Sequence, residues 1–228
     1  MLHWSLNDTW AAGGQIAGKD EKMLEVRELE CVRGDHRLFK DLNFTLRPGE
    51  LLYLRGKNGS GKTSLLRTIC GLTTPAGGEV LWKGENIRSL RDEFNRGLTF
   101  LGHLNGIKGE LNALENLQVA SALSGEKVPE NQIHDALQQI GLKGREDLPT
   151  KVLSQGQKRR VALARLLISK TTLWVLDEPF TALDVHAVEL LKGLITRHLT
   201  SGGMVILTTH QHVAIDTGVL KEIDLSAA

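Results

Sequence analysis

The stretch GKNGSGKT, residues 56–63 of a 228-residue chain, decides the fold class. It fills every fixed position of the phosphate-binding pattern G-x-x-x-x-G-K-[ST]. It also joins a strand-like run, ELLYLR at 50–55, to a run with helical spacing, SLLRTICGL at 64–72. The glycines allow backbone N–H groups to converge on phosphate oxygens, and the positive end of the following helix attracts an anion. The alternative is a glycine-rich turn with an exposed lysine, and the correct flanks argue against it. We therefore predict that phosphate is bound by Gly56, Lys57, Asn58, Gly59, Ser60, Gly61, Lys62, Thr63 and Ser64.

Two side chains of this loop carry chemistry of their own. Lys62 is placed to reach the β- and γ-phosphates of a nucleotide, and the hydroxyl of Thr63 is placed to ligate Mg²⁺. The loop therefore predicts a magnesium–nucleotide complex as the ligand.

An apolar strand that ends in two acids, LWVLDEP at 173–179, supplies a second part of the site. Ligands of open α/β sheets lie beyond the carboxyl ends of the strands, where Asp177 and Glu178 would emerge. Asp177 suits a water-mediated magnesium contact, and Glu178 suits a general base that accepts a proton from water. Alone, the pair could equally be a solvated turn. Together with the phosphate loop it predicts hydrolysis of a nucleotide.

A third motif, LSQGQKRR at 153–160, begins another expected helix, with Ser154 available as its N-cap. Ser154 and Gly156 at this helix start form a second anion-binding terminus in the same chain. By itself the motif would be an ordinary capped helix with a basic first turn. Its place between the phosphate loop and the Asp177–Glu178 pair favours a role in the same reaction.

These motifs together resemble those of the ATP-binding cassette (ABC) ATPases, over about residues 24–225. The resemblance implies that ATP and Mg²⁺ are bound and that two copies form a homodimer by closing head to tail. In that dimer Ser154 and Gly156 of one copy would contact the γ-phosphate held by the other. Gln155 stands where the family usually has a glycine, and its side chain fits only if it points away from the nucleotide.

The resemblance also assigns residues near the reacting phosphate. His210 matches the family's switch histidine, so that Lys62, Glu178 and His210 become the expected catalytic residues. Asp184, in FTALD at 180–184, matches the acid of the segment that links the two sites of the dimer. HQH at 210–212 could alternatively be a pair of metal ligands. Arg33 stands near the place of the aromatic residue that usually stacks on adenine.

Three stretches resemble one branch of the family, the ATPase subunits of cytochrome c maturation (haem-export) complexes. They are LGHLNGIKGELNALENL at 101–117, the run at 153–184, and ILTTHQ at 206–211. The resemblance implies a peripheral ATPase on the cytoplasmic face of the bacterial inner membrane, bound to integral membrane subunits. Hydrolysis would then drive haem export or release of a haem-loaded periplasmic chaperone. The alternatives are the ATPase of another ABC exporter and a soluble ABC ATPase that acts on an assembly scaffold.

The segment TFLGHLNGIKGE at 99–110 departs from the family pattern. Most members carry here a glutamine that contacts the metal and the attacking water, whereas this chain has no glutamine between Gln15 and Gln118. His103 or Leu104 occupies the position, depending on a register choice of one residue. We expect the loop to contact the membrane partner mainly, with Ile107 and Lys108 as candidate contacts.

The pattern of apolar residues predicts an α/β fold. LEVRELECV (24–32) and LNFTL (42–46) alternate like half-buried strands, whereas TLWVL (172–176) and MVILT (204–208) scarcely alternate, as in parallel strands covered on both faces. The family resemblance adds a mostly parallel core sheet, an antiparallel β subdomain and a helical subdomain inserted at about 93–158. We predict one ABC ATPase domain over 23–228 and a disordered tail over 1–22.

Composition limits the remaining possibilities. With 28 basic and 27 acidic residues the net charge is +1, which argues against non-specific binding of nucleic acid. No apolar run approaches the roughly 18–20 residues that a membrane span requires, so any span is expected in other chains. Cys31 and Cys70 are far apart and read as buried residues of a reducing compartment.

Overall fold

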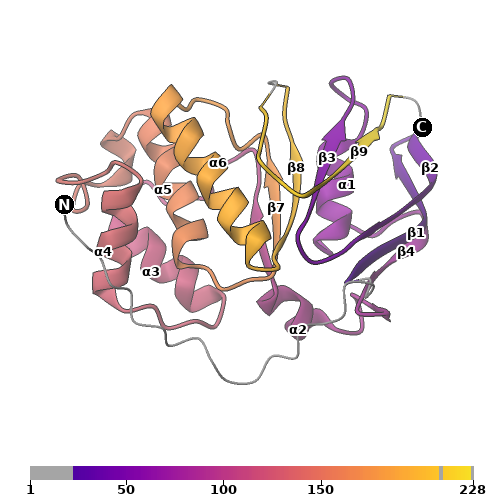
Figure 1. Ribbon diagram of the computed structural model, residues 1–228, viewed down its shortest axis with the longest axis horizontal. Coiled ribbons are helices and arrows are strands. Elements are labelled where there is room, and N and C mark those ends of the chain that lie inside the picture. Colours follow the sequence, from indigo (N-terminus) through magenta and orange to yellow (C-terminus); the bar gives the residue numbers. More distant parts are fainter. Residues whose placement is uncertain (1–22, 211–212, 227–228) are drawn as a thin grey trace.

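The computed structural model describes residues 23–210 and 213–226, which form two sheets and the helices that cover them (Figure 1). The larger sheet is parallel, with five strands in the order β6-β7-β8-β3-β9. The smaller sheet is antiparallel, in the order β2-β1-β4-β5. The predicted fold class, a mostly parallel core with an antiparallel β part and helices, is confirmed. The parallel strands are β3 (Glu50–Arg55), β6 (Leu98–Leu101), β7 (Leu173–Asp177), β8 (Met204–Thr208) and β9 (Val219–Asp224).

The centre of the parallel sheet is covered on both faces, as its apolar runs predict. All five residues of β7 and all five of β8 are buried. In β3, Leu52 and Leu54 join one core cluster with helix α1 (Lys62–Ile69), while Leu51 and Tyr53 join another with helix α6 (Val185–Thr200). Such two-sided burial fixes the ends of these strands, and it is these ends that carry the candidate site.

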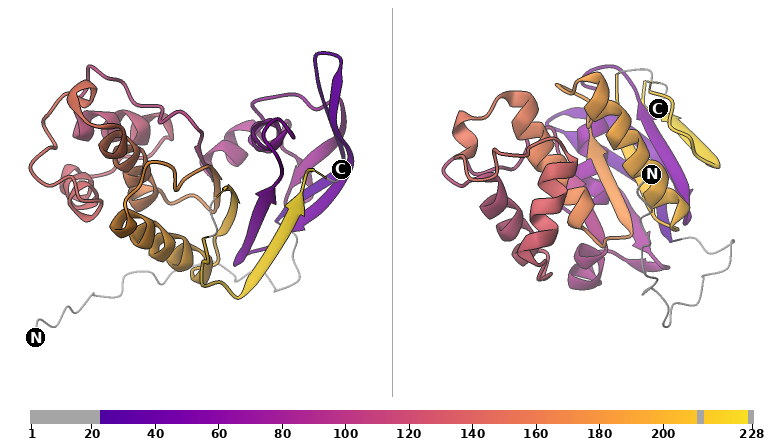
Figure 2. Two further views of the ribbon diagram at one scale, coloured as in Figure 1. Left: turned by 90° about the horizontal axis from the view of Figure 1, so that it is seen from above. Right: turned by 60° about the vertical axis from the view of Figure 1, so that its left-hand side comes forward.

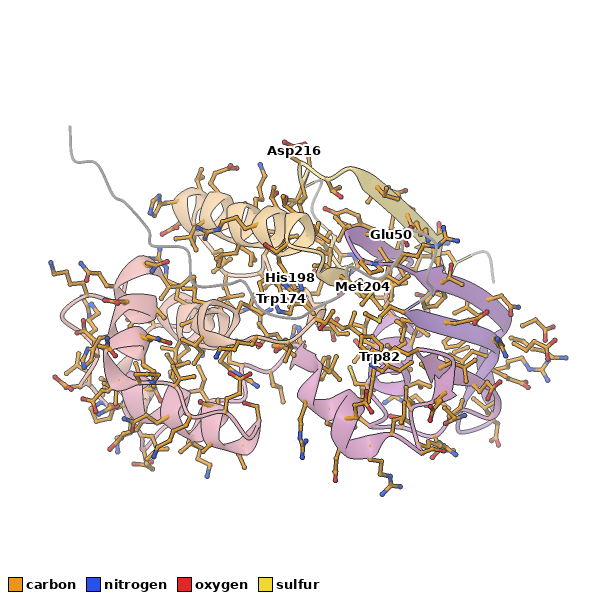
Figure 3. All side chains as sticks on the ribbon, turned by 60° about the horizontal axis from the view of Figure 1, so that its bottom comes forward. Glu50, Trp82, Trp174, His198, Met204 and Asp216 are labelled. Atoms are coloured by element: carbon orange, nitrogen blue, oxygen red, sulfur yellow. The ribbon has the colours of Figure 1, made fainter. Side chains whose placement is uncertain are left out.

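A ring contact adds to the packing of α6 on the sheet (Figure 3). Trp174 of β7 stacks on His198 of α6, with ring centroids 3.8 Å apart and planes 5° from parallel. Burial lowers the pKa of His198 to about 4, although its contact with the backbone of Thr172 opposes that shift. The imidazole is therefore neutral at physiological pH and acts as a packing group.

The antiparallel sheet is built from β1 (Leu24–Arg33), β2 (His36–Leu46), β4 (Gly77–Trp82) and β5 (Glu85–Asn86). Its inward face shares a core with α1, and that core includes Leu24, Val26 and Phe39. The ladder between β1 and β2 is irregular, and Glu28 and Asp41 adopt positive φ angles of 46° and 55°. Helix α1 consequently lies between the two sheets, with the phosphate loop at its start.

The stretch between β6 and β7 is helical, and it forms the lobe that stands apart from the sheets in Figure 2. Its α3 begins at Asn112, whose side chain and that of Glu115 cap each other's backbone N–H groups. Helix α2 and strand β6 precede this stretch. The predicted boundaries of the subdomain, about 93 and 158, stay a prediction. Helix α2 spans Arg91–Arg96, and the elements between β6 and β7 are α3 (Ala113–Leu123), α4 (Glu130–Gln139), the 3-10 turn η1 (Thr150–Val152) and α5 (Gln155–Ile168).

Across residues 23–210 and 213–226, none of the helices combines the length and the apolar character that crossing a membrane requires. The tail predicted over residues 1–22 lies outside the described residues.

Candidate functional site

A cavity of about 440 Å³ lies at the carboxyl ends of the parallel strands. Its wall combines the loop after β3, the end of β7, the residue that follows β8 and the segment after β6. Most of the residues predicted to bind nucleotide or metal line it together: Asn58, Gly59, Gly61, Lys62, Thr63, Ser64, Asp177, Glu178 and His210.

The phosphate loop has the conformation that its glycines permit. Gly61 precedes α1 at φ 98°, and a Cβ there would lie 3.1 Å from Cβ of Leu38. Gly56 has φ 144°, and a Cβ there would collide with Oγ of Ser60. A residue with a side chain at either position would adopt an unfavourable φ angle, and its Cβ would also be too close to neighbouring atoms. The loop therefore keeps its N–H groups accessible only because glycine stands at both places.

Lys62 lies inside this loop and is only 9% exposed. Its Nζ donates hydrogen bonds to the carbonyl oxygens of Gly56, at 2.6 Å, and of Lys57, at 3.0 Å. These contacts hold the ammonium group in the curve of the loop, where the N–H groups also converge.

The end of the chain supports the loop from outside. The N–H of Lys57 donates to Oγ of Ser226 at 3.0 Å, and the N–H of Leu225 donates to the carbonyl of Arg55. The sequence motifs gave no signal for this support, because the two segments meet only through the pairing of β9 with β3.

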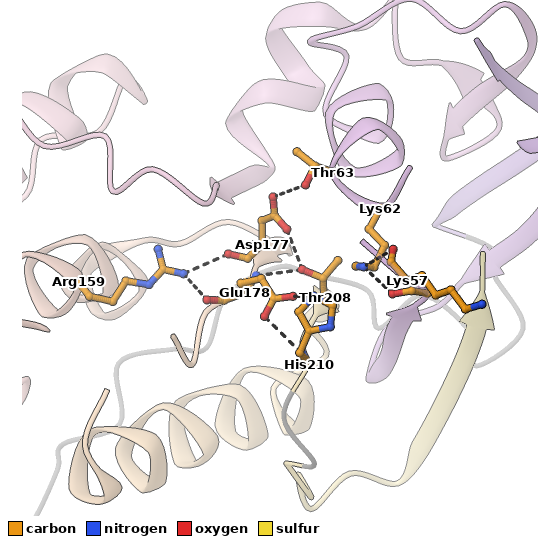
Figure 4. A network of polar contacts seen from close by, with 9 residues as sticks. Lys57, Lys62, Thr63, Arg159, Asp177, Glu178, Thr208 and His210 are labelled. Atoms are coloured by element: carbon orange, nitrogen blue, oxygen red, sulfur yellow. Dashed lines mark hydrogen bonds and ion pairs between the residues drawn. The ribbon is translucent and has the colours of Figure 1, made fainter. Parts of the chain in front are cut away.

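Asp177 is 2% exposed and both of its carboxylate oxygens accept hydrogen bonds (Figure 4). The hydroxyl of Thr63 donates to Oδ2 at 2.9 Å, and that of Thr208 donates to Oδ1 at 2.8 Å. Thr208 also accepts the N–H of Glu178 at 2.9 Å. Thr208, which sequence reasoning did not single out, thus orients both acids from the end of β8.

Glu178 adopts a left-handed backbone conformation, with φ 49°, which is uncommon for a residue other than glycine. Its side chain is 16% exposed, and Oε1 lies 3.4 Å from Nε2 of His210. The backbone N–H of His210 lies 3.3 Å from Oε2. Among the described residues the buried Oε1 accepts no hydrogen bond, and the one basic atom within ion-pair distance is Nε2 of His210. A costly backbone conformation of this kind is typical of a functional position.

His103 lines the cavity together with Thr63 and Asp177, whereas Leu104 does not line it and is 85% exposed. A neighbouring cavity of about 400 Å³ is lined by both His103 and Leu104, again with Thr63 and Asp177, so which of the two takes the place of the family's glutamine stays a prediction. Ile107 packs partly buried against the core, while Lys108 is exposed.

The predicted signature residues lie away from the cavity of their own chain. Ser154 is exposed and caps α5: its Oγ accepts the N–H of Gln157 at 3.2 Å, and the Gln157 side chain accepts the N–H of Ser154. A Cβ on Gly156 would lie 3.0 Å from the carbonyl of Ala182. The helix start thus packs closely on the segment 180–184. Neither Ser154 nor Gly156 lines the cavity described above.

Two arginines of the same motif anchor that helix, and sequence reasoning saw them only as part of a basic first turn. Arg160 forms an ion pair with Asp184, which itself caps α6 through the N–H of Ala187. Arg159 is 4% exposed and lies behind Asp177 and Glu178 (Figure 4). Burial lowers the pKa of Arg159, and the two neighbouring carboxylates oppose that shift.

Two further sequence hypotheses concern the rim of the cavity. Arg33 and Leu38 line it, so the place predicted for adenine contains an arginine and an aliphatic side chain. The alternative of a metal pair in HQH involves His212, which lies outside the described residues. Within the described ranges, no cluster of three or more histidine, cysteine, aspartate or glutamate residues is arranged to hold a metal ion.

Comparison with known proteins gives the same family as the motifs. The model of the family described as "ABC transporter" matches residues 39–181. The chain is 57% identical over 205 residues to the cytochrome c biogenesis ATP-binding export protein CcmA of Nitrosomonas europaea, covering 90% of this chain and 96% of that one. It is likewise 57% identical to the CcmA of Dechloromonas aromatica, over 89% of this chain and all of the relative.

Solved structures agree at lower identity. A putative ABC transporter ATP-binding protein from Pyrococcus furiosus superposes with a TM-score of 0.75 at 29% identity, covering 87% of this chain and 96% of that one. The resemblance to ABC ATPases and the closer resemblance to cytochrome c maturation subunits are both confirmed. The chain therefore belongs to the family of ABC transporter ATP-binding proteins.

Proposed function

We propose that this chain is the ATP-hydrolysing subunit of a cytochrome c biogenesis export complex that works on haem. The observation that carries the enzymatic part is the convergence of Lys62, Thr63, Asp177 and Glu178 on one cavity at the carboxyl edge of the sheet. The names of relatives at 48–57% identity support the choice of complex. A family ATPase that served another exporter would share the cavity but not this set of relatives.

The residues of the cavity divide the reaction among them. N–H groups of the loop and of the start of α1 bind the phosphates, and Lys62 adds a positive charge where negative charge develops. Glu178 accepts a proton from the attacking water, and His210, beside its carboxylate, contacts the γ-phosphate. Positioning and electrostatics supply most of the acceleration in phosphoryl transfer, which suits a site made of fixed loop ends.

The donors around Thr63 and Asp177 fit Mg²⁺. A hydroxyl and a carboxylate lie 2.9 Å apart, in an all-oxygen setting of the kind that Mg²⁺ prefers. Thr63 would hold the ion directly and Asp177 would hold it through water. The ion would neutralise charge on the β- and γ-phosphates. His103 offers a nitrogen, which is a poor magnesium ligand beside these oxygens.

The signature residues support a homodimer. Ser154 is exposed at a helix start that points away from its own nucleotide cavity, so the anion it suits would have to come from a second copy. Head-to-tail closure would bring Ser154 and Gly156 of one chain to the γ-phosphate of the other.

Integral membrane subunits would bind the chain at the cytoplasmic face of the inner membrane. We expect a tagged chain, extracted from membranes in mild detergent, to retain integral proteins of cytochrome c maturation and to hydrolyse Mg-ATP. Deleting the gene should abolish covalent haem staining of c-type cytochromes, and the wild-type gene should restore it. Retention of a lipid or drug permease, with normal staining in the deletion strain, would contradict the assignment.

The loop at 99–110 gives a prediction about the partner. His103→Ala should leave basal turnover within about twofold of wild type, because His103 is no essential metal ligand, but stimulation by the membrane subunits should be lost. Turnover is measured with and without the partner over a magnesium titration. A raised magnesium requirement in His103→Ala would show instead that the imidazole holds the ion or its water.

A further inference from the structure

We propose that Arg159 is a positioning residue for hydrolysis. Its guanidinium donates hydrogen bonds both to the segment that carries His103 and to the backbone of Asp177 and Glu178. It thereby fixes the relative positions of two walls of the cavity. The inference rests on the proposed role of Glu178 and adds a residue that does not itself touch the nucleotide cavity.

One side of the contact lies on the segment after β6. Nη1 of Arg159 donates to the carbonyl of Gly102 at 3.2 Å and to Oδ1 of Asn105 at 3.1 Å. These residues flank His103 on both sides. This segment lacks the glutamine that in most family members contacts the metal and the water. Arg159 thus fixes the loop from behind.

The other side lies at the end of β7. Nη2 donates to the carbonyls of Asp177, at 3.1 Å, and Glu178, at 2.8 Å, and Nε donates to the carbonyl of Pro179 at 3.4 Å. These bonds surround the residue with the left-handed backbone, a conformation that costs about 1–3 kcal/mol and persists only where the surroundings over-determine it. Arg159 holds the carbonyl side of Glu178, while Thr208 holds its N–H.

Only arginine can make this set of contacts. A guanidinium has five N–H groups in a planar fork, and the five contacts of Arg159 use that number. A lysine has three donors at a single point and cannot span two segments in the same way. All five acceptors are neutral oxygens, and the carboxylates of Asp177 and Glu178 nearby favour the charged form.

The position of Arg159 on α5 connects the exposed start of this helix, which is proposed to face the second copy, with the site of hydrolysis. The helix begins at Ser154, which is exposed, and Arg159 lies little more than one turn further on, buried under the catalytic edge. A displacement of the helix start in the dimer would therefore move the backbone of Glu178 and the His103 segment together.

Two substitutions test the inference in the full-length chain, purified with the membrane subunits it retains. Arg159→Met keeps an unbranched stem but no donors, and Arg159→Lys keeps the charge. We expect Arg159→Met to lower kcat by about 100-fold, as a misplacement of about 1 Å can do. The KM for ATP and the Kd of a fluorescent ATP analogue should stay within about twofold, because the phosphate loop is untouched. Arg159→Lys should recover only part of the rate.

Hydrogen exchange supplies a readout that a general loss of stability would not reproduce. In Arg159→Met, amides of residues 102–105 and of Asp177, Glu178 and Phe180 should exchange faster while those of 56–63 keep their protection. Asn105→Ala, which removes one of the five acceptors and leaves the other four in place, should lower kcat less and in the same direction. Lys158→Met is the matched control, because Lys158 precedes Arg159 on the helix and its ammonium group donates to the carbonyl of Lys151 in an exposed contact.

The outcomes separate this inference from the proposed function. Wild-type kcat in Arg159→Met or in Arg159→Lys would overturn it. So would a loss of nucleotide affinity in step with kcat, because that would mark a folding role. If Glu178→Gln abolishes hydrolysis while Arg159→Met does not, only the positioning role fails. If Glu178→Gln hydrolyses ATP normally, the assignment of Glu178 as the base fails, and if the wild-type chain with its membrane subunits hydrolyses no Mg-ATP, the proposed function itself fails.

Discussion

Replacing Glu178 by glutamine is expected to lower kcat by about 10²–10⁴-fold, the usual contribution of a positioned general base. The change keeps the size of the side chain and its place beside His210, but a neutral amide cannot take the proton from water. Nucleotide binding should survive, because the loop and Lys62 are unchanged. With ATP bound and not hydrolysed, the closed homodimer should accumulate and elute as a dimer in size-exclusion chromatography.

The control for this experiment is Glu189→Gln, on the exposed face of α6. Glu189 pairs there with Lys192 at 2.9 Å, and exposed pairs of this kind contribute little. That variant should hydrolyse ATP like wild type and elute alike with and without nucleotide. A monomeric Glu178→Gln protein in Mg-ATP would contradict the head-to-tail dimer, and full turnover would contradict the assignment of the base.

Replacing Lys62 by alanine is expected to reduce kcat/KM by at least about 10²–10³-fold. Losses of this size are typical when a preorganised donor that stabilises the negative charge of the transition state is removed. Two effects act together. The phosphates lose a cation, and the loop loses the bonds from Nζ to the carbonyls of Gly56 and Lys57. Both ATP affinity and turnover should therefore fall, in contrast to Glu178→Gln.

Equilibrium binding of a fluorescent ATP analogue separates the two parts of the loss. Lys192→Ala serves as the control, since it removes a lysine from a helix that does not line the cavity. Unchanged hydrolysis in Lys62→Ala would refute the phosphate loop as the nucleotide site. Loss of binding with an unchanged thermal midpoint would show that the lysine acts on the ligand and not on folding.

Much of the fold could be predicted because local signals and burial agreed. The uninterrupted apolar runs that became β7 and β8, and the glycine pattern before α1, each have one stable solution in an α/β sheet. Ser154 caps α5 as expected. Helix α6 was not predicted, although Asp184, assigned to another role, is its N-cap.

Site residues could be predicted only where they belong to a contiguous sequence motif with a known chemical role. The phosphate loop and Asp177–Glu178 belong to that class. Thr208, Arg159 and Ser226 do not, since each acts through contacts between segments far apart in the chain, and nothing local distinguishes them from ordinary residues. The choice between His103 and Leu104 likewise depends on the direction of one turn after β6, which strand periodicity does not determine.

The position of β3 in the sheet also has a consequence for synthesis of the protein. β3 leads into the phosphate loop, but its neighbours are the two last strands: Leu51 pairs with Val205 on one side and with Leu220 on the other. At about 5–20 residues per second, a ribosome needs roughly 7 to 30 seconds to make the chain between β3 and β8. During that interval the nascent chain exposes an apolar strand edge, which is a hazard for aggregation. ATP cannot protect it, because the nucleotide site acquires its framework only after β8 and β9 have been made.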